Sequence, residues 1–175
     1  MLFRSGVVSL FFRNDYYATQ EQYLEAIANA MREEYRAIVE AGFLLQIDCP
    51  DLAMGRHIQY ASLTVEEFRR KAALHIESLN HALEGLPADR LRLHLCWGNY
   101  EGPHHWDVPL KDILDVVFQA KPAGLSFEAA NPRHAHEWQV FETVKLPEGK
   151  VLIPGVLESK SNFIEHPELV AQRIG

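Results

Sequence analysis

The sequence predicts an α/β fold made of parallel βα units. Two observations predict it: strand-like and helix-like stretches alternate along the 175 residues, and each of the later strand-like stretches ends in a polar or ionisable residue. Alternation of this kind is typical of strands joined by crossover helices in a parallel sheet. No G-x-G-x-x-G motif follows the first apolar run, so a dinucleotide-binding fold gains no support. We expect one domain spanning residues 1–175.

The elements follow from hydrophobic periodicity and from helix-capping residues. A 3.6-residue period and a capping residue at each start (Thr19 with Gln22, Thr64 with Glu67) predict two long helices. Gly42 is expected to end the first of these helices. The expected strands are 6–12, 43–47, 91–96, 123–127 and 151–153, and the expected helices are 19–41, 64–83, 110–119, 134–144 and 167–174.

Composition excludes several classes of function. Hydrophobic residues make up 47% of the chain, charged residues 23%, and the formal net charge is -7. A net negative chain without a basic stripe argues against a nucleic-acid partner. The sequence contains no run of ~20 apolar residues, so it does not predict a membrane span. The apolar start lacks a signal-peptide cleavage pattern, and the two cysteines favour thiols or metal ligands over a disulfide, so we expect a cytoplasmic protein.

The strand expected at 91–96 carries a candidate metal site. Because side chains alternate faces along a strand, the leucines of LRLHLC point one way, while His94 and Cys96 point the other way and can reach one ion. On the next strand Glu128 shares a face with Ser126, and in a parallel sheet it would arrive beside His94 and Cys96. Imidazole, thiolate and carboxylate together form a zinc-binding set. The alternative interpretation is a core histidine beside a buried thiol.

These stretches resemble a known family. LRLHLCWGNYEGPHHWDVPL, LSFEAANPRHAHE and VLIPGVLESKSN are similar to the C-terminal catalytic barrel of cobalamin-independent methionine synthase, and closer still to its shorter bacterial homologues. The similarity extends from FFRNDYY through QIDCPDLAM to HPELVAQRI. It implies a TIM (β/α)8 barrel. Such barrels need ~250 residues, so the chain would hold about half to two thirds of one, and the family's last zinc ligand, a cysteine on the final strand, would be missing.

The resemblance implies a zinc enzyme that alkylates thiols, such as a methyltransferase of methionine biosynthesis acting on homocysteine with a methyl-folate donor. His94, Cys96 and Glu128 match the zinc ligands, and Asp48 matches the acid that holds the substrate's amino group. Glu158 and Lys160, after the Pro-Gly-Val turn, are the candidate catalytic residues; the family's histidine is absent there. Trp97, Asn99 and Tyr100 would bind substrate, and His104 and His105 would line the same pocket.

Three alternatives remain open. Some relatives transfer an alkyl group from an epoxide to a thiol cofactor. A partial barrel with open sheet edges would favour self-association, so an inactive fragment or a homo-oligomer is a second alternative. A metal-dependent aldolase or isomerase is a third, although Cys96 argues against it because such sites usually prefer nitrogen and oxygen ligands.

Overall fold

The computed structural model describes residues 2–3 and 5–175. Within them five strands form one parallel sheet in the order β1-β2-β3-β4-β5. The strands are β1 (Leu2–Phe3), β2 (Leu45–Cys49), β3 (Leu91–Leu95), β4 (Gly124–Glu128) and β5 (Val151–Gly155). The helices are α1 (Ser5–Phe11), α2 (Gln20–Glu40), α3 (Met54–Ile58), α4 (Val65–Ala82), α5 (Leu114–Val117) and α6 (Pro167–Ile174). Short 3-10 helices cover Pro50–Leu52, Ala88–Arg90, Leu110–Asp112 and Glu137–Glu142.

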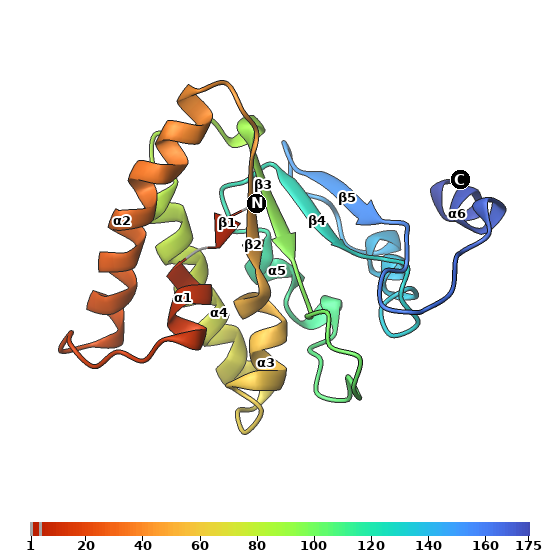
Figure 1. Cartoon of the computed structure of the whole chain (residues 1–175), viewed down its shortest axis with the longest axis horizontal. Coiled ribbons are helices and arrows are strands. Elements are labelled where there is room, and N and C mark those ends of the chain that lie inside the picture. The colour runs from red at the N-terminus through yellow and green to blue at the C-terminus, as the bar shows by residue number, and fades with distance from the viewer. Residues whose placement is uncertain (1, 4) are drawn as a thin grey trace.

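The order of the strands in the sheet is their order in the sequence. Each strand pairs in parallel with the next, and α1, α2 and α4 lie together on one side of the sheet (Figure 1). Right-handed crossovers that always step in one direction place their helices on the same face. The structure therefore confirms an α/β fold of parallel βα units. In the part of the chain that is described, β1 and β5 are edge strands and the sheet does not close into a barrel.

The two long helices begin where their capping residues predict. The Thr19 side chain accepts a hydrogen bond from the Gln22 N–H. Thr64 forms a complete capping box: its hydroxyl accepts from the Glu67 N–H while the Glu67 carboxylate accepts from the Thr64 N–H. Gly42, with φ +88°, follows α2. Among the helices of the described residues, none combines the length and apolarity that a membrane span requires.

The hydrophobic core lies between the sheet and the long helices. Leu91, Leu93 and Leu95 of β3 are almost fully buried, whereas Arg92 on the opposite face is exposed. Phe68 and Ile76 of α4 belong to the same core cluster. One face of the sheet thus packs against the long helices, and the opposite face carries the polar side chains.

Three expected elements differ from the structure. The run 6–12 was expected as a strand but lies in helix α1, because a short apolar run fits a strand and a buried helix equally well and here Val7 and Leu10 pack inward as a helical stripe. The expected helix 110–119 is reduced to a 3-10 turn and the four-residue α5. The expected helix 134–144 contains a 3-10 helix at Glu137–Glu142.

Candidate metal centre

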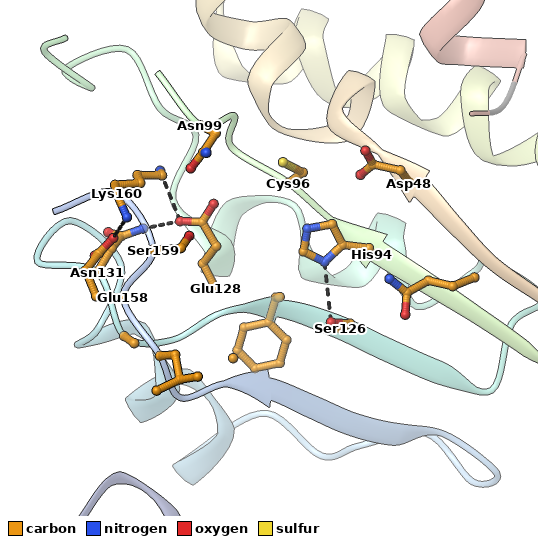
Figure 2. Close-up of a pocket in the computed structure, with 15 residues that line it drawn as sticks. Asp48, His94, Cys96, Asn99, Ser126, Glu128, Asn131, Glu158, Ser159 and Lys160 are labelled. Carbon is orange, nitrogen blue, oxygen red and sulfur yellow. Dashed lines mark hydrogen bonds and ion pairs between the residues drawn. The ribbon is translucent and has the colours of Figure 1, made fainter. Parts of the chain in front are cut away.

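Three potential ligands meet at the carboxyl ends of neighbouring strands. Asp48 of β2 pairs directly with His94 of β3 in the sheet register, and Cys96 follows two residues later on the same face. Ligand atoms from these three side chains all lie within 4.8 Å of one another. Figure 2 shows the three side chains directed into one space at the ends of the strands. This meeting of groups is a consequence of register, since the residue opposite His94 on β2 must share its face.

The three side chains border a cavity of about 430 Å³. The wall opposite them comes from the segments that follow β4 and β5 (Figure 2). The complete lining consists of Gln46, Asp48, His94, Cys96, Asn99, Ser126, Phe127, Glu128, Ala130, Asn131, Gly155, Leu157, Glu158, Ser159 and Lys160. The cavity therefore opens at the end of the parallel sheet where α/β proteins usually place their ligands.

Asp48 is a buried carboxylate with unused bonding capacity. The residue is 8% exposed, and its Oδ1 atom is buried without a hydrogen-bond partner. Burial raises the pKa of Asp48, and the nearby charge of Asp51 adds to the increase, while His94 and the backbone N–H of Cys49 oppose it. A buried, unpartnered carboxylate oxygen is costly unless a cation or a donor satisfies it.

Cys96 lies in a tight turn that holds its sulfur in the cavity. Gly98 has φ +89° and turns the chain so that its N–H donates to Cys96 Sγ at 3.3 Å. A Cβ at Gly98 would lie 2.5 Å from Met54 Sδ, so the flexible Met54 side chain would have to move, while the positive φ favours glycine at this position. Burial raises the pKa of the Cys96 thiol to about 11, and the negative charges of Asp48 and Glu128 contribute to the shift.

These properties fit a zinc ion. His94 Nδ1 lies 3.4 Å from Ser126 Oγ, and a hydrogen-bond partner on one ring nitrogen suits a ligand role for the other. A divalent cation would satisfy the free oxygen of Asp48 and replace the proton of Cys96, and its charge would offset the burial that raises both pKa values. Carboxylate, imidazole and thiolate form a donor set that zinc accepts in tetrahedral sites. Three protein ligands leave a fourth position for a substrate, as in catalytic zinc sites.

Glu128, expected as the third ligand, lies elsewhere on the wall of the same cavity. It ends β4, two residues beyond the Ser126 that pairs with His94. Its Oε2 lies 3.2 Å from Lys160 Nζ and accepts a hydrogen bond from the Asn131 side chain. The group of mutually close ligand atoms found in the described residues contains Asp48 instead. A ligand role for Glu128 stays a prediction.

Glu158 and Lys160 also reach the cavity. Glu158 Oε1 accepts from the Lys160 N–H at 2.6 Å, whereas its Oε2 is buried without a hydrogen-bond partner. The segment after β5 is held by Glu165, which accepts a hydrogen bond from the Glu158 N–H at 2.8 Å and forms an ion pair with Arg173 at 2.6 Å. Glu158 and Lys160 therefore border the cavity opposite the candidate ligands.

The other expected pocket residues lie in different places. Asn99 lines the cavity, while Tyr100 and His104 line a neighbouring pocket that shares Asn131, Glu158 and Lys160 with it. His105 is exposed and its ring contacts Trp106.

The structure does not place Trp97 in the cavity: its side chain is 1% exposed, lies in the core and donates from Nε1 to the Val108 carbonyl at 2.9 Å. Successive residues after a strand point in different directions, so the residue after Cys96 turns into the core.

Sequence reasoning missed two features of the site. The first is Asp48 as a neighbour of His94 and Cys96, which only the pairing of β2 with β3 reveals. The second is Asn131, whose side chain holds Glu128 and whose Oδ1 accepts from the N–H groups of Arg133 and His134. An Asn-Pro pair directly after a strand is a turn signal, and it was the available clue to this role. Comparison of the chain with protein-family models, with curated proteins and with solved structures found no match.

Proposed function

We propose that the chain binds a zinc ion through Asp48, His94 and Cys96 and uses the site to activate a thiol for alkyl transfer. The observation that carries this proposal is the convergence of three ligand types within 4.8 Å at the ends of β2 and β3. The thiolate ligand Cys96 favours zinc over the harder cations. The resemblance to the catalytic barrel of methionine synthase suggests the reaction class. We also propose that the βα units of this chain are part of a TIM barrel like that of the family.

When bound, zinc would lower the pKa of a substrate thiol so that it is a nucleophile at neutral pH. The chain's own residues would orient the reactants. One wall of the cavity is formed by Asp48, His94 and Cys96. The opposite wall carries the ion pair of Lys160 with Glu128, which places a positive and a negative charge there. The Glu158 carboxylate borders the same cavity and would accept the proton of the substrate thiol.

The placement of Asp48 favours one variant of the reaction. A carboxylate engaged beside His94 and Cys96 is not free to hold the amino group of homocysteine, as the resemblance implied. This favours a thiol without an amino-acid head group as the acceptor, which is compatible with the alternative transfer of an alkyl group from an epoxide to a thiol cofactor. Methyl-folate with homocysteine remains the alternative donor and acceptor pair. A panel of thiols offered with each donor separates the two reactions.

The test of the metal site is zinc content after purification and dialysis. Wild type and Cys49→Ala are expected to retain about one zinc ion each, and Cys96→Ser to lose it. Cys49 is the matched control because its thiol is fully buried in the core and points toward the Ile47 carbonyl. Equal zinc in wild type and Cys96→Ser would contradict the ligand assignment. A wild-type chain without zinc that is monomeric in light scattering would support the inactive-fragment alternative instead, and self-association would support the homo-oligomer alternative.

A further inference from the structure

His134 is buried between the loops that follow β3 and β4. The residue is 2% exposed. Its Nε2 lies 2.9 Å from Asp107 Oδ2, and its Nδ1 lies 2.8 Å from Glu137 Oε2. Each ring nitrogen therefore faces a carboxylate oxygen at hydrogen-bond distance, one on each side of the ring.

This geometry specifies the protonation state of the ring. An ionised carboxylate only accepts hydrogen bonds, and neutral imidazole has one N–H donor. With both carboxylates ionised, both contacts of His134 are satisfied together only when both ring nitrogens carry protons. Two flanking carboxylates compensate the buried positive charge, which is the condition under which a buried charge is tolerated.

Each partner of His134 connects it to a different part of the site. Glu137 Oε1 accepts from the Leu110 N–H at 2.7 Å, at the end of the loop after β3. The ring of Trp97, the residue after Cys96, lies 4.3 Å from the His134 ring, centroid to centroid. The His134 N–H donates to Asn131 Oδ1 at 3.0 Å, and Asn131 in turn donates to Glu128.

We propose that His134 is a buried imidazolium and a positioning residue, which clamps the loops after β3 and β4 and so holds Asn131, Glu128 and Cys96 around the cavity. This inference rests on the proposed function for its chemical consequence, but the clamp itself is a property of the metal-free chain. The Pro-Arg-His-Ala-His-Glu run of the sequence supplies the ring and one of its two carboxylates.

The charged and titratable groups that face His134 come from both sides. Asp107 and Glu137 accept its hydrogen bonds, and His104 Nδ1 lies 2.8 Å from the same Asp107 oxygen. Burial alone would lower the pKa of His134, but the bonds to Asp107 and Glu137 outweigh it and raise the pKa. Burial would likewise raise the pKa of Asp107, yet the bonds from His134 and His104 lower it.

Protonation of His134 should therefore couple to stability in a defined direction. A folded-state pKa above the unfolded value means that the stabilisation is complete below the unfolded pKa and is lost as pH rises through the folded pKa. For Asp107 the sign is opposite: its contribution is present above the unfolded pKa and is lost as pH falls through the lowered folded pKa.

The first test is a pH titration of the ¹⁵N-histidine ring signals of the metal-free full chain. The signal absent from the His134→Gln spectrum is expected to keep its imidazolium shift to a higher pH in the folded chain than in the urea-unfolded chain. Asp107→Asn, which keeps the shape of the side chain, is expected to lower the folded-state midpoint because it removes one of the two carboxylates. Equal midpoints in the folded and the unfolded chain would overturn the imidazolium assignment.

The second test asks whether the clamp positions the cavity. The side-chain amide signal of Asn131, assigned from Asn131→Asp, is expected to shift in His134→Gln and to stay unchanged in His136→Gln, which alters an exposed ring two residues away. An unchanged Asn131 signal in a folded His134→Gln would overturn the positioning role. Zinc affinity is expected to fall about tenfold in His134→Gln only. If the wild type binds no zinc, the proposed function fails, while both spectroscopic tests still decide the clamp.

Discussion

The pH dependence of zinc binding offers the sharpest test of the site. The Cys96 thiol has a pKa of about 11 in the metal-free chain. At pH 7 only about one molecule in ten thousand then carries the thiolate, because each pH unit below the pKa lowers its fraction tenfold. Zinc must displace that proton, which costs about 5 kcal/mol of binding free energy at pH 7. An ordinary thiol with a pKa near ~8.5 would cost only about 2 kcal/mol.

The assay is competition with a chromophoric chelator of known zinc affinity between pH 7 and pH 9.5. Zinc affinity is expected to rise about tenfold for each pH unit and to keep rising up to pH 9.5, where an ordinary thiol would already have levelled off. The Cys96→Ser variant should lose this slope, and Cys49→Ala should retain it. A plateau in the wild type above pH 8.5 would refute the raised pKa, and a flat profile would refute Cys96 as a ligand.

Three further predictions concern stability and the ligand set. Asp48→Asn is expected to weaken zinc binding 10- to 100-fold. It is also expected to stabilise the metal-free chain at pH 7, because burial raises the pKa of Asp48 and the charged carboxylate therefore destabilises the fold. A variant that is less stable than wild type in urea unfolding would contradict this. Gly98→Ala should destabilise the chain by about 1–3 kcal/mol, from its positive φ and the approach to Met54, and should reduce zinc binding; the same midpoint and zinc content as wild type would count against the turn. Thr64→Ala should cost about 1 kcal/mol by removal of the capping box, with zinc content unchanged, and a loss of zinc would mean that α4 supports the site more directly than inferred.

The local elements were predictable to the extent that short-range physics decides them. Thr19 and Thr64 begin their helices because a side-chain oxygen satisfies a free backbone N–H within three residues. The alternation in β3 likewise follows from strand geometry alone. The run 6–12 was misassigned because an apolar stretch of seven residues carries no period long enough to separate a strand from a buried helix.

The site was predictable only in part, for the same reason. His94 and Cys96 share one strand, so their common face is a local property that sequence spacing reveals. Asp48 and Glu128 lie on different strands, and which of them approaches His94 depends on how each strand pairs with β3. The register places Asp48 opposite His94 and Glu128 two residues farther along, and no pattern in the sequence specifies that offset.

The amino-acid sequence was sufficient for the class of fold, the starts of the long helices and the two candidate ligands at the end of β3, because periodicity, capping and strand alternation act over a few residues. Only the tertiary structure decided that Asp48 completes the candidate ligand set, that Trp97 belongs to the core and that His134 joins two loops. Those outcomes depend on strand register and on contacts between side chains from separate segments, such as Asp107 and His134, which lie 27 residues apart in the chain. Such contacts form only when the whole sheet packs against its helices.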